Sequence, residues 1–122
     1  LFAVDRGNSR VNRWYRQSHP IVLRTLQYIC QKVAQFPGKR VSLCGELAGQ
    51  ARALPLLLGA GLRRLSMNSN FVPAVRSCIE KVTIDECNEL FAEASQMSSE
   101  LDVQKLLDDF YRRKEIDLMS LS

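Results

Sequence analysis

The sequence predicts an α/β fold in which two short strands alternate with helices and further helices follow. Residues 41–44 form a short apolar segment with the composition of a buried strand, and residues 64–67 are interpreted as a second short strand. About 20 residues separate them, enough for a helical crossover, so the two strands should run parallel. Beyond residue 82, apolar residues recur at helical spacing behind helix-start signals. The chain therefore combines a β-α-β-α middle with a helical tail.

The first helix is predicted over residues 18–35, after a polar, arginine-rich loop. Ser18 followed by Pro20 has the pattern of an N-cap with proline in the first turn, and Pro37-Gly38 ends the helix. One apolar stripe along this helix should face the core. Its members are Val22, Leu23, Leu26, Ile29, Cys30 and Val33.

Each predicted strand is followed by a helix. The strand over 41–44 leads to a helix over 51–58, which the glycine-rich segment 59–61 ends. The strand over 64–67 leads to a helix that begins near residue 71 and continues to Val82.

Two capping signals open the tail. Thr83 with Glu86 three residues later matches a capping box and begins a helix that reaches about Ser95. Ser99 with Asp102 is a looser version of the same device. The helix that it starts should fade near residue 117, with its apolar side formed by Leu101, Leu106, Leu107, Phe110 and Ile116.

Composition is that of one soluble globular domain. The chain has 122 residues, of which 46% are hydrophobic and 25% charged. No apolar run approaches the roughly 18 residues of a membrane span, and residues 1–4 lack a signal-peptide pattern. We therefore expect a cytoplasmic protein without a membrane partner. The chain lacks an initiator methionine and starts in mid-pattern, so we expect it to be part of a longer protein.

The four cysteines, Cys30, Cys44, Cys78 and Cys87, show no CxxC spacing, and the sequence has one histidine. Both facts argue against a zinc site. Cys30 and Cys78 lie on apolar faces of predicted helices, so we expect them to be reduced core residues in a reducing compartment.

The net charge of +4 is unevenly distributed. Residues 1–64 carry eleven Lys/Arg and two acids, whereas residues 65–122 carry six Lys/Arg and eleven acids. A basic half indicates an anionic ligand, either a phosphorylated metabolite or nucleic acid. Aromatic residues are few and the basic residues form no nucleic-acid-binding motif, so we expect no nucleic-acid partner.

Cys44 is the candidate for chemistry. It ends the first predicted strand, and the carboxyl end of a strand in a strand–loop–helix unit is where α/β proteins place catalytic groups. A free cysteine is also commonly a small buried hydrophobic residue. Position alone leaves both interpretations open.

Four sequence blocks decide between them: CGELAG at 44–49, AVDRGN at 3–8, HP at 19–20 and LSM at 65–67. In this order and at this spacing they resemble the C-terminal part of the phosphoenolpyruvate-protein phosphotransferases, the enzyme I of bacterial sugar phosphotransferase systems. The resemblance continues weakly to the last residue.

The resemblance implies the fold in more detail. Residues 1–82 should be a C-terminal fragment of a (β/α)8 TIM-type barrel, about two βα units, and residues 83–122 the C-terminal helices of the same domain. A complete barrel needs about 250 residues, and two strands do not form a stable sheet alone. The remaining strands are therefore expected elsewhere in a longer protein.

The resemblance also implies the reaction. Phosphoenolpyruvate binds with Mg²⁺ at the carboxyl-end face of the barrel, and a histidine on another domain takes the phosphoryl group and passes it to a phosphocarrier protein. The pyruvate enolate that remains must be protonated, and the resemblance gives this role to Cys44. An ordinary thiol titrates at about 8.5, so it holds a proton at neutral pH that it can donate.

Three further residues are candidates, the first of them by resemblance. Arg6 matches the substrate-binding arginine, whose planar guanidinium can hold two oxygens of a carboxylate or phosphate. Gly45 would allow the backbone to approach the ligand closely. Glu46 could orient Cys44 or a water molecule, or pair with a nearby arginine. His19 stands where the family performs no phosphoryl transfer, so we interpret it as a helix-terminal residue.

No metal ligand is expected within this chain, because the resemblance places the Mg²⁺ ligands before Leu1. Gln50 departs from the family pattern by replacing the aspartate that usually follows Ala-Gly. Glutamine is a poor N-cap for the helix that follows, and the effect of this change is left open.

Other assignments remain. Phosphoenolpyruvate synthases and pyruvate phosphate dikinases share the barrel and the donor cysteine but differ after Cys-Gly. This segment does not distinguish the sugar-system enzyme from its nitrogen-related paralogue. A dimerisation fragment without activity is the alternative from another class, since the family's C-terminal domain forms the homodimer contact.

Overall fold

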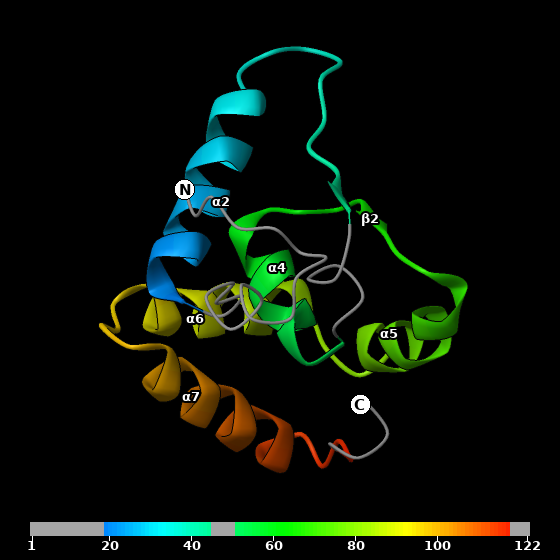
Figure 1. Cartoon of the computed structure of the whole chain (residues 1–122), viewed down its shortest axis with the longest axis vertical. Helices are drawn as coiled ribbons and strands as arrows, with labels where there is room; N and C mark the ends of the chain where they lie inside the picture. The colour runs from blue at the N-terminus through cyan, green and yellow to red at the C-terminus, as the bar shows by residue number, and fades with distance from the viewer. Residues whose placement is uncertain (1–18, 45–50, 118–122) are drawn as a thin grey trace, which may run out of the picture.

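The computed structural model describes residues 19–44 and 51–117 (Figure 1). In chain order its elements are α2 (Pro20–Val33), β1 (Leu43–Cys44), the 3₁₀ turn η1 (Ala51–Ala53), α4 (Leu54–Ala60), β2 (Leu65–Ser66), the 3₁₀ turn η2 (Ser69–Phe71), α5 (Val72–Ile79), α6 (Ile84–Ser95) and α7 (Glu100–Arg113).

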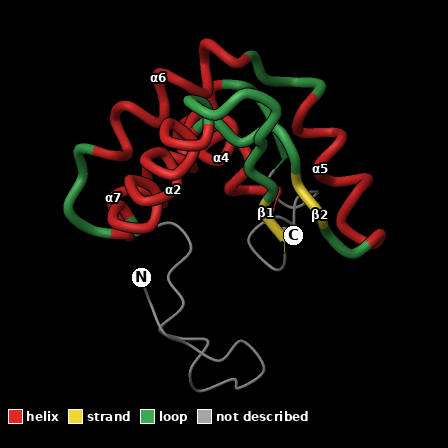
Figure 2. The backbone as a smooth tube through the Cα atoms, turned by 90° about the horizontal axis from the view of Figure 1, so that it is seen from above, coloured by secondary structure: helices red, strands yellow, loops and turns green. Residues whose placement is uncertain are grey.

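The two strands run parallel. They lie side by side, as Figure 2 shows. Leu43 is opposite Leu65 and Cys44 is opposite Ser66. The prediction of parallel strands with a helical crossover is confirmed, although each strand has two residues and not four. Ladder hydrogen bonds need a neighbouring strand, and within residues 19–44 and 51–117 the two strands are paired only over this short stretch. The described part of the chain is mostly helical, so membership of a TIM-type barrel stays a prediction.

Helix α4 forms the centre of the molecule. Leu54, Leu56 and Leu57 are fully buried, as expected of a helix that is hydrophobic on all sides. It packs most extensively against α6. The predicted bounds of 51–58 are shifted: residues 51–53 are a 3₁₀ turn, and α4 runs through Gly59 to Ala60. The prediction that the segment 59–61 ends this helix is confirmed. Gly61, with φ of +112°, ends it in the left-handed conformation that glycine adopts without strain.

Close packing between α4 and α6 depends on Gly59. A Cβ atom at this position would lie 2.4 Å from the carbonyl oxygen of Cys87 and 2.6 Å from the Cβ of Phe91. Both distances are shorter than van der Waals contact. The absent side chain therefore sets how closely the two helices approach.

Helix α2 lies across α4 and α6, and its N-cap is His19, not Ser18 as predicted. The His19 Nδ1 accepts a hydrogen bond from the Ile21 amide at 3.1 Å. The predicted apolar stripe is only partly correct, because Leu23 is buried but Ile29 is exposed. Only one side of this helix packs against α4 and α6. Arg24 links it to the end of α6 by donating from Nη1 to the Ser95 carbonyl oxygen at 2.7 Å.

The tail helices begin where their capping signals predict. In α6 both hydrogen bonds of the capping box form between Thr83 and Glu86. In α7 the Ser99 hydroxyl accepts from the Asp102 amide at 3.2 Å. This helix ends at Arg113, before the predicted limit, and Leu101 is exposed instead of buried. Its buried side is formed by Val103, Leu107, Phe110 and Tyr111.

Helix α5 also ends earlier than predicted. It stops at Ile79 and does not reach Val82, and a 3₁₀ turn precedes it. The first two amides after the helix donate back to its last turn, from Glu80 to the Arg76 carbonyl and from Lys81 to the Cys78 carbonyl. In both Figure 1 and Figure 2, α5 lies on the opposite side of the molecule from α2 and α7.

Removing the α6 cap should have a moderate effect on stability. We expect Thr83→Ala to lower the free energy of unfolding by about 1 kcal/mol, because the Glu86 amide loses its acceptor. Thr25→Ala is the matched control: the Thr25 hydroxyl bonds to the Ile21 carbonyl inside α2, where alanine continues the helix. Urea unfolding of both variants measures the difference, and equal losses would contradict a specific capping role.

Candidate functional site

The candidate site is the edge of the sheet where both strands end. Because Cys44 and Ser66 are partners in a parallel pair, the carboxyl ends of β1 and β2 reach the same edge. In sheets of this kind, ligands bind outside the carboxyl ends of the strands. The backbone thus places Cys44 where the sequence predicts a catalytic group.

Polar residues follow β2 at this edge. Ser66 is exposed, and the side chain of Asn68 accepts a hydrogen bond from the Asn70 amide at 3.0 Å. This bond starts η2, which leads into α5. Sequence reasoning did not consider Ser66 or Asn68 as site residues. The signal that it passed over is the polar run Ser66–Asn70, interrupted only by Met67, at the end of a strand and before a helix.

Most of the predicted site lies outside the described residues. Arg6, Gly45 and Glu46 fall there, as does Gln50. Cys44 is described only through its backbone. The distance between its thiol and Arg6 is therefore untested, and their common role stays a prediction.

His19 is the predicted helix-terminal residue. Its ring caps α2 through the Ile21 amide, so this interpretation is confirmed for its position.

The remaining thiols are not activated nucleophiles. Cys30, Cys78 and Cys87 are free, and burial raises the pKa of each, for Cys87 to about 11. An activated cysteine requires the opposite shift. The prediction of a reduced core residue is confirmed for Cys78, which is fully buried, whereas Cys30 is only half-buried.

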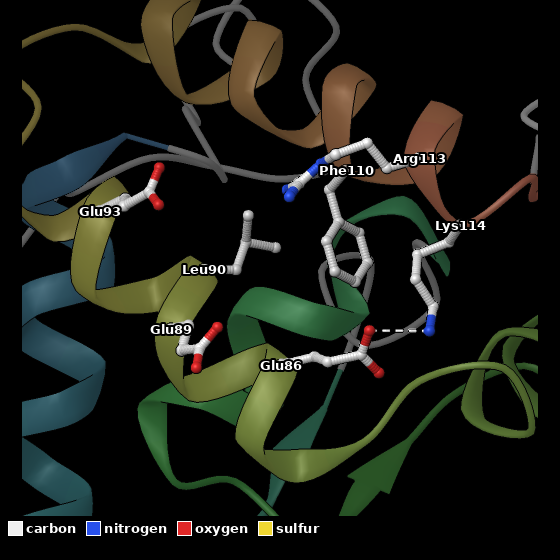
Figure 3. Close-up of a pocket in the computed structure, with 7 residues that line it drawn as sticks. All are labelled: Glu86, Glu89, Leu90, Glu93, Phe110, Arg113 and Lys114. Carbon is white, nitrogen blue, oxygen red and sulfur yellow. Dashed lines mark ion pairs between the residues drawn. The ribbon is translucent and has the colours of Figure 1, made fainter.

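A small cleft between α6 and the end of α7 is a second place to consider (Figure 3). Glu86, Glu89 and Glu93 line it on one side, and Arg113 and Lys114 on the other. The Nζ of Lys114 lies 2.7 Å from Oε2 of Glu86, and this contact lowers the pKa of the carboxyl group. The cleft has a volume of about 120 Å³. Metabolite sites occupy roughly 300 Å³ or more, so this cleft is too small for one.

Within residues 19–44 and 51–117, no group of three or more His, Cys, Asp or Glu side chains is placed to hold a metal ion. No helix in the same ranges is long and apolar enough to cross a bilayer.

Comparison with known families assigns the chain. The family model for PEP-utilising enzymes, PEP-binding domain, matches residues 1–84, which include both strands and the crossover between them. The chain belongs to this family. The resemblance stated from the four sequence blocks is thereby confirmed.

Relatives of this chain extend the similarity into α6 and α7. Multiphosphoryl transfer protein 1 of Escherichia coli (strain K12) is 42% identical over 116 residues, which is 95% of this chain and 14% of that protein. A phosphoenolpyruvate-protein phosphotransferase of Mycoplasma genitalium is 36% identical over 94% of this chain and 20% of that protein. One of Buchnera aphidicola is 35% identical over 88% of this chain and 19% of that protein. The chain thus spans a fifth or less of the length of these relatives.

Proposed function

We propose that this chain is the C-terminal part of the PEP-binding domain of a phosphoenolpyruvate-protein phosphotransferase. The observation that carries the proposal is the similarity to proteins of that name over nearly the whole chain, tail helices included. The names of these relatives favour a phosphotransferase over a phosphoenolpyruvate synthase or a pyruvate phosphate dikinase. Two βα units of a (β/α)8 barrel followed by C-terminal helices are the corresponding fold.

The proposed reaction moves a phosphoryl group from phosphoenolpyruvate to a histidine on another domain, and from there to a phosphocarrier protein. The O–P bond of the substrate breaks as an N–P bond to the histidine forms. The pyruvate enolate left behind takes the Cys44 proton at carbon, and the resulting thiolate recovers a proton from water. A protonated thiol suits this step. A thiol with a strongly lowered pKa would already be a thiolate at neutral pH and would have no proton to donate.

The position of Cys44 supports its role as donor. Its backbone is at the carboxyl end of β1 beside Ser66, the edge at which barrel enzymes place catalytic groups. Arg6 is proposed to bind the carboxylate or phosphate of the substrate, and Gly45 to let the backbone approach it. Glu46 is proposed to orient Cys44 or a water molecule.

Magnesium would supply charge neutralisation at the transferring phosphate. Among residues 19–44 and 51–117, the acidic side chains form no cluster that fits this ion, so its ligands are proposed to come from outside these ranges. We further propose a cytoplasmic homodimer whose contact involves the C-terminal domain.

The test replaces Cys44 in a full-length enzyme that carries this chain. Cys44→Ala is expected to slow pyruvate formation by roughly 10²–10⁴-fold, the usual contribution of a general acid, while KM for phosphoenolpyruvate changes little. Arg6→Ala should show the opposite pattern, a raised KM. Steady-state kinetics of pyruvate release measure both parameters.

Ser42→Ala is the matched control, because Ser42 is exposed and precedes β1 by one residue. Its kcat and KM should equal those of the parent enzyme. Unchanged turnover in Cys44→Ala would remove the donor assignment and leave the family assignment intact.

A further inference from the structure

A basic cleft lies at the other end of the strand pair from Cys44. Its volume is about 430 Å³, within the range of small-molecule sites. Lys39 and Arg40 line it from the loop before β1, and Arg63 and Arg64 line it from the turn before β2. In Figure 1 these segments belong to the arch formed by α2, the loop that follows it and the connection from α4 to β2.

The floor of this basic cleft is apolar and well supported. Cys30 and Val33 line it from α2, and Val41 and Gly61 from the two loops. Both Cys30 and Val41 pack against the core cluster of Ala53, Leu57 and Leu62. The floor of the cleft is therefore backed by packed side chains.

Arg63 is held in place by the end of α4. Its Nη1 donates to the carbonyl oxygens of Leu58 and Leu62, at 2.8 and 2.7 Å. Its positive charge also acts on Cys30 in the floor of the cleft. Burial raises the pKa of the Cys30 thiol, and the nearby Arg63 guanidinium opposes that rise. Arg63 is exposed, but these two hydrogen bonds hold its guanidinium beside the cleft.

The four basic side chains have no acidic counterpart among residues 19–44 and 51–117. No carboxylate from these ranges lines the cleft, and none of the ion pairs within them includes Lys39, Arg40, Arg63 or Arg64. The strand pair brings the two loops together, since the Leu43 amide donates to the Arg64 carbonyl oxygen at 3.1 Å. Four like charges around one cleft repel one another, and a bound anion would relieve that repulsion.

We infer that the basic cleft binds a small molecule carrying two or more phosphate groups. Four cations match a polyphosphate better than a singly charged anion, and guanidinium groups hold phosphate oxygens in pairs. The apolar floor between Val33 and Val41 would contact the organic part of such a ligand. The site does not depend on the proposed phosphotransferase reaction, because that reaction is placed at the opposite edge of the strands.

Calorimetric titration of the chain with tripolyphosphate and, separately, with ATP tests this inference. We expect binding with Kd below about 1 mM at physiological salt, and a loss of at least tenfold, about 1.4 kcal/mol, in the double variant Arg40→Ser/Arg64→Ser. Both residues are exposed, so this variant should fold normally. Equal affinity for the two probes would show that the cleft recognises the phosphate groups alone. Tighter binding of ATP would show that the apolar floor also contacts the organic part of the ligand.

The control double variant Arg76→Ser/Lys105→Ser removes the same charge from exposed positions on α5 and α7. Its affinity for tripolyphosphate should stay within twofold of the parent chain. Equal weakening in both double variants would show nonspecific attraction by net charge and overturn the proposal. Absence of binding by the parent chain to both probes would overturn it as well.

Discussion

Replacing Gly59 with alanine is expected to lower the free energy of unfolding by about 3 kcal/mol. The new Cβ would meet the Cys87 carbonyl oxygen at 2.4 Å and the Phe91 Cβ at 2.6 Å. A backbone oxygen cannot turn aside as a flexible side chain can. Helices α4 and α6 would have to separate, and overpacking of this kind costs roughly 1–3 kcal/mol or more.

A competing effect acts in the opposite direction, so the sign of the stability change tests this prediction. Alanine favours a helix interior over glycine by about 1 kcal/mol, so an unpacked Gly59 would become more stable on substitution. Thermal unfolding of the chain should instead show a drop of roughly 10 °C or more. Gly38→Ala is the control, because a Cβ there has nothing within 4 Å and meets only the strain of φ +77°. A stabilised Gly59→Ala variant would contradict the α4–α6 packing.

Tyr111→Phe should have the second largest effect, a loss of about 2 kcal/mol. The Tyr111 hydroxyl donates to the Arg52 carbonyl oxygen at 2.6 Å, and the ring is fully buried. Phenylalanine keeps the ring but leaves that carbonyl without this donor, and an unsatisfied buried acceptor costs roughly 1–3 kcal/mol. Arg52 is in η1, so the bond ties α7 to the turn that precedes α4.

The pH dependence of the Tyr111 variant provides a second measurement. Burial raises the pKa of Tyr111 above the value near 10 of an exposed tyrosine. Its stabilising contribution is therefore complete below pH 10 and declines above it, because the unfolded chain then loses the phenolic proton more readily. The difference in urea unfolding between parent and Tyr111→Phe should be full at pH 7 and smaller above pH 10.

Tyr28→Phe is the matched control for this substitution. Tyr28 is 60% exposed, and its ring contact with Lys32 does not require the hydroxyl. It should change the unfolding free energy by less than about 0.5 kcal/mol. If both tyrosine variants behaved alike, the Tyr111 hydrogen bond would contribute nothing specific.

Signals within a few residues were enough to predict several elements. The Thr83–Glu86 capping box predicts the start of α6, and the spacing of the apolar residues predicts its end. Ser99 predicts the start of α7. The length of the crossover predicts the parallel direction of the strands. The ordered blocks identify the family. Each of these predictions depends on short-range sequence signals, on the length of a connection, or on the residues and order of sequence motifs.

Candidate site residues divide in the same way. The sequence places Cys44 at a strand end, and the backbone confirms that position. Ser66 lies beside Cys44 because the two strands pair in this register, and the sequence motif around Cys44 does not specify that register. The roles of Arg6, Gly45 and Glu46 stay predictions, because they lie outside the described residues.

The amino-acid sequence by itself determined the family, the order of helices and strands, and the capped starts of the tail helices. Only the tertiary structure decided that Ile29 is exposed, that α4 continues through Gly59, and that Lys39 and Arg64 line one cleft. The physical reason is the range of the interactions. Caps and helical spacing act between residues three or four apart, whereas burial, close helix contacts and clustered charge depend on which distant segments meet.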